Sequence, residues 1–316
     1  MPGLYETLMN AIPELTAFDL RPLTGSLGAD IVGINLLTAS DEEIAQVQTA
    51  LDHCHVLAIR DQNLDPAGFH KVARRFGPFS GNMIHRPLEG FEDIVRFTRN
   101  PEDRGPVVGE DFHMDLAWME IPPGITMLYG EEIPPVGGDT LFASLSAAYE
   151  GLSDTMRNLI LNLIGVHSGK GVFAINASNT ALSVKASGQA VEEIETEHPL
   201  VCRHPVTGRP YLYLSGVLQR FVGMTEEESK PIIDFLISHA LRGEYTCRLR
   251  WEPRTLTMWA NPYLMHAAIN DYHGHRRVVL RSTVAGSPPI AAGAGDQENG
   301  STTFRKGNFR KSRSRE

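Results

Sequence analysis

Apolar residues recur with helical spacing in the segment 41–54. Ile44, Val47 and Leu51 fall on one face, and acidic residues occupy the first turn. Ser40 precedes them and is a residue type suited to cap a helix N-terminus. The pattern predicts an amphipathic helix over these residues.

Three further segments show the same periodicity. Asp65 followed by Pro66 starts a helical pattern that runs to a glycine, which predicts a helix over 65–77. Similar spacing predicts helices over 144–164 and 225–241.

The rest of the chain favours strands. Residues 17–37 alternate apolar and polar positions between glycines, and 55–62 is a short apolar run with polar ends. Later apolar runs, separated by Pro and Gly, are GITMLYG, DTLFAS, RPYLYL, CRLRW, TLTMWA and RRVVLRSTVAG. Many short strands without alternating βαβ units predict a mainly β chain with helical insertions, in a sandwich or barrel.

Composition narrows the class of protein. The 316 residues are 42% hydrophobic and 21% charged, which excludes disorder of the whole chain, and no apolar run is long enough to span a membrane. The three cysteines are far apart and form no CxxC pattern, which is typical of reduced thiols. The first residues lack the charge and apolar pattern of a secretory signal. We therefore expect a cytoplasmic protein.

The C-terminal end differs in composition. Residues 286–316 are rich in Gly, Ser and charge, and 305–316 hold six basic residues and one acid, whereas the whole chain has a net charge of −9. We expect one domain over 1–289 and a basic, flexible tail over 290–316. Because the remainder is acidic, we expect neither nucleic acid nor a membrane as partner.

A candidate metal site lies in GEDFHMDLAWME. His113 and Asp115 are two residues apart and would share one face of an extended segment, and His266 lies far downstream in NPYLMHAAIN. Two histidines and one carboxylate leave coordination positions open, as in non-haem Fe(II) oxygenases. Such residues are also common on surfaces and in cores, and the same ligands could serve a zinc hydrolase or lyase that performs no redox chemistry.

Two arginines follow His266. On a strand, Arg277 and Arg281 share one face, so both guanidinium groups would point into the interior. Such burial is costly unless anions pair with them, and arginine pairs bidentately with carboxylates. The anions could belong to a ligand or to acidic residues of a neighbouring strand.

These stretches resemble the taurine dioxygenase/dichlorophenoxyacetate dioxygenase family of Fe(II)- and 2-oxoglutarate-dependent oxygenases, from about residue 20 to 289. The matching segments are RPLTGSLGADIVGINL, RRFG, FHMD, PPVGGDTLFAS, HPVTGRPYLYL, RWEPRTLTMW and HAAINDYHGHRRVVLRSTVAG. The resemblance implies a double-stranded β-helix (a jelly roll, cupin-like), with helices outside and over the mouth.

The resemblance also implies roles for single residues. His113, Asp115 and His266 correspond to the ligands of Fe(II). Thr140 and Arg277 correspond to the pair that binds the distal carboxylate of 2-oxoglutarate, and Arg281 corresponds to a residue that binds an acidic group of the prime substrate. Trp259 corresponds to an aromatic residue near the metal. The implied reaction uses O2 and releases succinate and CO2, and the carboxylate ligand favours hydroxylation over halogenation.

The departures from the family concern the substrate. Asn82 and His85 stand where the taurine enzymes have a histidine and a tyrosine, and Gly109 replaces an asparagine, which argues against taurine. Leu116 and Trp118 follow the carboxylate, and by alternation Trp118 would face the iron. We take Asn82, His85, Leu116 and Trp118 as candidate substrate contacts. For Trp118 core packing is the ordinary alternative, and His85 could be a plain loop residue.

The sequence thus predicts an oxygenase that hydroxylates a small organic acid, such as a carboxylate, a sulfonate or an aryloxyalkanoate. A natural-product intermediate is an alternative substrate for the same chemistry. We expect a homo-oligomer, a dimer or a tetramer.

Overall fold

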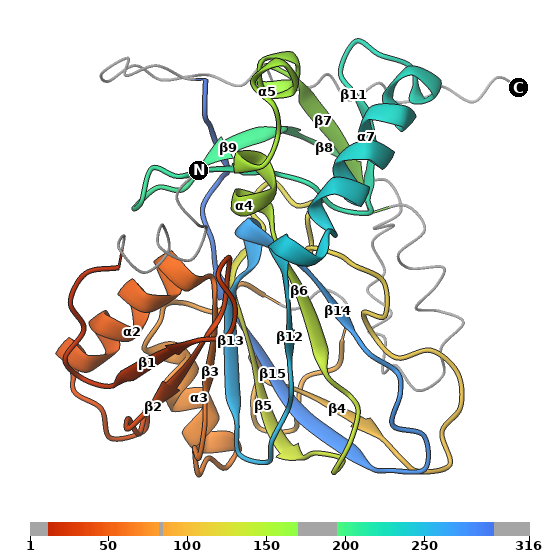
Figure 1. Ribbon diagram of the computed structural model, residues 1–316. Coiled ribbons are helices and arrows are strands. Elements are labelled where there is room, and N and C mark those ends of the chain that lie inside the picture. Colours follow the sequence, from red (N-terminus) through yellow and green to blue (C-terminus); the bar gives the residue numbers. More distant parts are fainter. Residues whose placement is uncertain (1–11, 82–84, 170–194, 294–316) are drawn as a thin grey trace, which may run out of the picture.

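The architecture is dominated by strands. A computed structural model gives the structure of residues 12–81, 85–169 and 195–293 (Figure 1). These residues form one sheet of seven strands and three sheets of three strands, with helices around them. The prediction of a mainly β chain with helical insertions is confirmed.

The seven-stranded sheet forms one wall of the molecule. Its neighbouring strands are antiparallel, apart from the parallel pair β2–β3. In spatial order the strands are β1 (Asp19–Pro22), β2 (Ala29–Val32), β3 (Val56–Ile59), β13 (Leu256–Ala260), β5 (Pro123–Glu132), β15 (Arg277–Ala285) and β4 (Val95–Arg99).

Two helices cover one face of this sheet, α2 (Asp41–Cys54) and α3 (Pro66–Arg74) (Figure 1). Successive side chains of a strand point to opposite faces. Met127 and Tyr129 of β5 therefore join the core beneath the helices, whereas Leu128 between them lines a cavity on the other face. The sheet separates a helix-covered core from an interior space.

A second sheet packs against that inner face. It consists of β12 (Thr246–Leu249), β6 (Thr140–Ser144) and β14 (Leu264–Ala268), with β6 in the middle. A core cluster contains buried residues of both sheets, namely Val56, Ala58 and Trp259 from the first and Phe142, Cys247, Leu249 and Leu264 from the second. The two sheets thus form a sandwich.

The remaining elements extend one end of the sandwich and share a separate core cluster. The strands are β7 (Ile164–Ser168), β8 (Glu195–Pro199), β9 (Val201–Arg203), β10 (Pro210–Leu212), β11 (Leu218–Phe221) and β16 (Ile290–Ala291). The helices are α4 (Leu145–Glu150), α5 (Asp154–Ile160), α7 (Glu226–Ala240) and the 3-10 helices η2 (Gly243–Tyr245) and η3 (Asn261–Tyr263).

The predicted helices are found, with one difference in extent. The helix predicted over 41–54 has those bounds, and Ser40 caps it by accepting a hydrogen bond from the N–H of Glu43. The single helix predicted over 144–164 is wrong, because α4 and α5 are separate. Ser153 caps α5 by accepting from the N–H of Met156, so the chain starts a new helix there.

The end of the chain is only partly described. Ile290–Ala291, which we expected in the flexible tail, pairs with β9 as strand β16. Residues 294–316, with the basic cluster, lie outside the described residues. All three cysteines are buried and free of disulfides. No helix among the described residues combines the length and apolar character needed to span a bilayer.

Buried neutral histidines predict a marked dependence of stability on pH. Burial, reinforced by the charge of His198, lowers the pKa of His167 to about 3, and burial together with His53 and Arg209 lowers that of His204 to about 4. Between these values and about 6.5 the unfolded chain binds more protons than the folded chain, so stability rises with pH. Each such histidine should therefore reduce the free energy of unfolding by about 1.4 kcal/mol per pH unit as the pH falls from 6 to 4.5. Urea denaturation across this range measures the slope, and a flat profile would contradict the assignment.

Candidate active site

Two histidines face each other across an isolated backbone bridge. The N–H of His113 donates to the carbonyl of His266 at 3.0 Å, and the N–H of His266 donates back at 2.9 Å. Residues that exchange both hydrogen bonds in an antiparallel pair lie directly opposite one another, with side chains on the same face. The centroids of the two imidazole rings are 4.2 Å apart. Backbone pairing therefore joins the two histidines that are far apart in sequence.

Asp115 is held by buried polar partners. The side-chain oxygen of Asn261 accepts from the Asp115 N–H at 2.9 Å, and the Asn261 amide donates to the Asp115 carbonyl at 3.0 Å. The Thr126 hydroxyl donates to Oδ2 of the carboxylate at 2.7 Å. Because Oδ2 is engaged by Thr126, Oδ1 is the carboxylate oxygen that faces the histidines.

The three side chains fit around one metal ion. Oδ1 of Asp115 lies 3.7 Å from Nε2 of His113 and 3.9 Å from Nε2 of His266. Two atoms that each lie about 2.1 Å from an ion are at most about 4.2 Å apart. Two imidazole nitrogens and one carboxylate that leave positions open are typical ligands of non-haem Fe(II). The geometry and the donor set are therefore both compatible with an iron site.

The protonation states of these groups suit a cation. The Nδ1–H of His113 donates to the Asp111 carbonyl at 2.8 Å, which leaves a lone pair on Nε2. Burial, reinforced by His113, lowers the pKa of His266 to about 3. Burial alone would raise the pKa of Asp115, but Arg281, His266 and His113 together outweigh burial and hold the pKa well below its usual value. At neutral pH the cluster offers the carboxylate of Asp115 and the neutral imidazole of His266.

The two arginines predicted to face the interior differ in their partners. Nη2 of Arg281 lies 2.9 Å from Oδ1 of Asp115, so an acidic residue of the chain pairs with this cation. Arg277 has no ion pair among the described residues, and its buried Nε has no hydrogen-bond partner there. Of the two, only Arg277 is left as a cation that calls for an anion from elsewhere.

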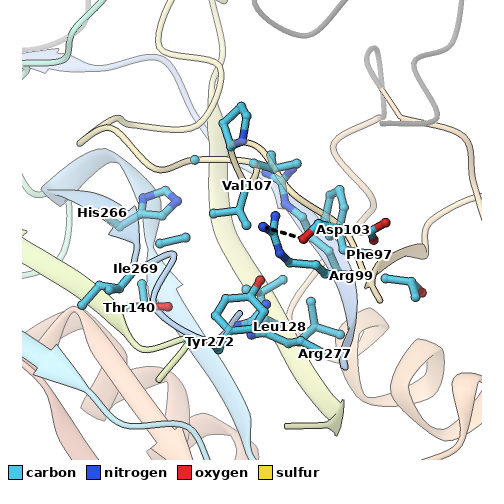
Figure 2. Close-up of a pocket in the computed structure, with 18 of the residues that line it drawn as sticks. Phe97, Arg99, Asp103, Val107, Leu128, Thr140, His266, Ile269, Tyr272 and Arg277 are labelled. Atoms are coloured by element: carbon cyan, nitrogen blue, oxygen red, sulfur yellow. Dashed lines mark hydrogen bonds between the residues drawn. The ribbon is translucent and has the colours of Figure 1, made fainter. Parts of the chain in front are cut away.

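These groups line one cavity of about 250 Å³ between the two sheets. Figure 2 shows His266 and Thr140 on one side of it and Arg99, Tyr272 and Arg277 on the other. The arginines and acids in its lining are Arg96, Arg99, Asp103, Arg104, Asp115, Arg277 and Arg281. Five arginines against two acids give the cavity a positive potential that favours anionic ligands.

A loop after β4 covers part of the cavity. The Arg99 guanidinium donates to the carbonyls of Asp103 and Gly105, and the Asn270 amide also donates to Gly105. Figure 2 marks the bond between Arg99 and Asp103. Gly109, near the end of this loop, has φ +77°, and a Cβ there would lie 2.7 Å from the His113 ring. The positive φ and the lack of space both favour glycine at this position.

Thr140 and Arg277 both line the cavity, as their predicted roles require. Thr140 is the first residue of β6, and its hydroxyl accepts a hydrogen bond from the indole of Trp251 at 3.0 Å. The Arg277 guanidinium lies 5.5 Å from the ring centroid of Trp251 and 5.8 Å from that of Tyr272. The Thr140 hydroxyl and the Arg277 guanidinium thus offer hydrogen-bond donors to the cavity.

The residues predicted to contact the substrate lie in different surroundings. His85 is buried beside Phe97, and burial, with the Arg281 charge, lowers its pKa to about 4. None of His85, Leu116 and Trp118 belongs to the cavity lining, and Trp118 is buried with its carbonyl accepting from the Thr196 hydroxyl. A left-handed backbone at Leu116 (φ 49°) breaks the alternation on which the prediction for Trp118 depended. Asn82 lies outside the described residues.

Several residues of the site belong to no motif or periodic pattern in the sequence. Thr126, Asn261, Arg99 and Tyr272 are single polar or aromatic residues outside any short motif. Alternation within VRFTR would not have singled out Arg99, because the four consecutive residues 96–99 all line the cavity. The roles of Thr126 and Asn261 depend on tertiary contacts alone.

Comparisons with known proteins agree with this geometry. Residues 19–283 match the model of the "Taurine catabolism dioxygenase TauD, TfdA family". The chain is 32% identical over 278 residues to an alkylsulfatase of Acinetobacter baylyi, covering 86% of each chain. It is 30% identical over 285 residues to an alpha-ketoglutarate-dependent sulfate ester dioxygenase of Pseudomonas putida, covering 88% of this chain and 93% of the relative. A solved structure of a putative taurine dioxygenase from Burkholderia xenovorans superposes with a TM-score of 0.73 at 29% identity, over 87% of this chain and 94% of that one.

The hydrogen bond from Thr126 to Asp115 predicts a positioning role. Thr126→Val keeps the shape of the side chain but frees Oδ2, so we expect metal affinity to fall about 10- to 100-fold, as for other groups that orient metal ligands. Titration with Mn(II) under calorimetry measures this. Thr257→Val on the adjacent strand is the matched control, because the buried Thr257 hydroxyl has no hydrogen-bond partner in the described part of the chain. Equal affinities for the two variants would contradict the role of Thr126.

Proposed function

Since the chain belongs to the taurine catabolism dioxygenase TauD, TfdA family and is a 2-oxoglutarate-dependent non-haem iron dioxygenase, we propose that it hydroxylates a small anionic molecule held in the arginine-lined cavity. The observation that carries this proposal is the position of the His113, Asp115 and His266 cluster in a cavity with five arginines. A metal site and anion-binding groups that share one space suit an oxygenase of acidic substrates.

His113, Asp115 and His266 are the proposed ligands of Fe(II). Support comes from their donor atoms, which all lie within 4.8 Å of one another, and from the polar partners that orient them. When bound, Fe(II) and 2-oxoglutarate activate O2, so that R–H, 2-oxoglutarate and O2 give R–OH, succinate and CO2. The protein binds and orients the reactants and keeps the metal ligands deprotonated.

Thr140 and Arg277 are the proposed site for the distal carboxylate of 2-oxoglutarate. A buried guanidinium without an acidic partner among the described residues is costly unless an anion pairs with it. A planar guanidinium and a hydroxyl together match a carboxylate, which accepts several hydrogen bonds. The cavity is continuous from these residues to the metal cluster.

The prime substrate is proposed to be a small sulfate ester, sulfonate or carboxylate. The two relatives described above act on sulfate esters by their names, and a further relative from Sphingobium herbicidovorans is a (S)-phenoxypropionate dioxygenase. Arg281, which lines the cavity, is the proposed contact of the anionic group. On substrate binding, the Arg281 guanidinium would donate to both Asp115 and the substrate, since its fork carries five N–H groups.

We also propose that the two packed sheets form the double-stranded β-helix of this family, within a single domain that includes β16. The sandwich core between the sheets supports this arrangement. It places the metal cluster between the sheets rather than on the surface.

The direct test of the proposed function is succinate formation. The purified protein, supplied with Fe(II), 2-oxoglutarate, O2 and a panel of alkyl sulfates, sulfonates and aryloxyalkanoates, should form succinate faster with one class of anion. His113→Ala should abolish this activity, because it removes one metal ligand. Stimulation by the neutral alcohols alone, or turnover retained in His113→Ala, would refute the proposal.

The two arginines predict a separation of binding constants. Arg277→Leu should raise the KM for 2-oxoglutarate about 10- to 100-fold, because a charge-assisted hydrogen bond contributes about 1.5–3 kcal/mol. Arg281→Lys keeps the charge next to Asp115 but loses the planar fork, and it should raise the KM for the anionic substrate more than that for 2-oxoglutarate. Steady-state kinetics of both substrates measures the split. The same profile from both variants would show that the pair is misassigned.

A further inference from the structure

Trp251 lies behind the proposed 2-oxoglutarate site and touches both of its residues. The side chain is 3% exposed and does not line the cavity. Its indole N–H donates to the Thr140 hydroxyl at 3.0 Å, and its ring lies 5.5 Å from the Arg277 guanidinium carbon. One buried aromatic residue therefore connects the two groups that would bind the distal carboxylate.

Strand register places Trp251 there. Leu249, the last residue of β12, lies directly opposite Thr140 in the pairing of β12 with β6. Two residues later the chain has left the strand, and Trp251 packs into the core between the two sheets with Phe142 and Trp259. The position of the indole relative to Thr140 is thus set by backbone pairing and core packing.

The hydrogen bond determines which way the Thr140 hydroxyl donates. An indole N–H can only donate, whereas a hydroxyl has one donor and two acceptor sites. Thr140 must therefore accept from Trp251, and its own proton is left to donate to another group. The hydroxyl donates no hydrogen bond to another described residue. A carboxylate oxygen, which can only accept, is the complementary ligand.

The ring of Trp251 acts on the second group. Arg277 lies near the faces of both Trp251 and Tyr272, and such contacts favour one orientation of a buried guanidinium. The bulk of the indole also fills the space behind Thr140 and Arg277, so neither can retreat from the cavity.

We propose that Trp251 is a positioning residue that makes the site selective for 2-oxo acids with a distal carboxylate. Its N–H fixes Thr140 as a donor, and its ring fixes Arg277 next to it. This role rests on the proposed function, in which Thr140 and Arg277 bind 2-oxoglutarate. A 2-oxo acid without the second carboxylate, such as 2-oxobutyrate, has no group for Thr140 and Arg277 to bind, so its affinity would not depend on Trp251.

Binding measurements without turnover test this role. The Mn(II)-loaded protein is titrated by calorimetry with 2-oxoglutarate, with N-oxalylglycine and with 2-oxobutyrate. Trp251→Phe keeps an aromatic ring beside Arg277 but removes the N–H and part of the ring system, and it should weaken the first two ligands about 3- to 10-fold while leaving 2-oxobutyrate within twofold. Tyr129→Phe is the matched control, since it removes a buried aromatic hydrogen bond to the Gln62 carbonyl away from the cavity and should change none of the three.

A double-mutant cycle separates this role from general packing. In a Thr140→Val background Trp251→Phe should weaken 2-oxoglutarate binding by a smaller factor than in the wild type, because the hydrogen bond to Thr140 is already lost. In Thr140→Ser, which keeps the hydroxyl, it should weaken binding by the same factor as in the wild type. If Trp251→Phe does not fold, the indole N–H signal of Trp251 in the otherwise unchanged enzyme is followed by NMR. It should shift on adding 2-oxoglutarate and not on adding 2-oxobutyrate.

Other outcomes overturn the proposal. Equal weakening of all three ligands would assign Trp251 a purely structural role, and additive effects with Thr140→Val would show that it does not act through Thr140. A wild-type protein that binds 2-oxobutyrate as tightly as 2-oxoglutarate would refute the proposed cosubstrate site itself. That last result can be distinguished from a failure of the Trp251 role alone, because it is measured on the wild-type protein.

Discussion

The site depends on the pair of backbone hydrogen bonds between His113 and His266. That bridge, together with the hydrogen bond from the Ala268 N–H to the Gly109 carbonyl, fixes the loop that carries His113 and Asp115 to β14. The bridge places the two imidazoles side by side. Asn261 and Thr126 then orient the carboxylate of Asp115, two residues after His113. The geometry of a metal site is thus built mainly from main-chain pairing, the most rigid contact a protein can form.

Alternation along the strands explains how one sheet serves two environments. In β15, Leu280 joins the core beneath the helices while Val279 and Arg281 face the cavity. The same alternation lets β5 place Leu128 at the cavity and its neighbours in the core. Cationic side chains can therefore gather on the inner face without disturbing the apolar packing that stabilises the fold. The ion pair with Asp115 reduces the free-energy cost of burying Arg281. Arg277 has no such partner among the described residues, so its burial favours an anionic ligand.

The sequence predicted those features that are local or periodic. The helix over 41–54 and the mainly β class follow from spacing, and the three clustered residues were found because HxD and the family resemblance both marked them. The split at Ser153 was missed because the apolar spacing continues across it. The placement of Trp118 was not predictable from alternation, since a left-handed residue intervenes. Thr126, Asn261 and Trp251 act through contacts between distant strands, which no local pattern records.

The central claim is that His113, Asp115 and His266 bind a single iron ion. X-ray absorption spectroscopy of the Fe(II)-loaded protein tests it most directly, because imidazole ligands give characteristic outer-shell scattering. The account predicts oxygen and nitrogen neighbours at about 2.1 Å, no sulfur, and scattering from two imidazoles that falls to one in His266→Ala. Scattering that is unchanged in His266→Ala, or a sulfur neighbour from one of the buried cysteines, would contradict it.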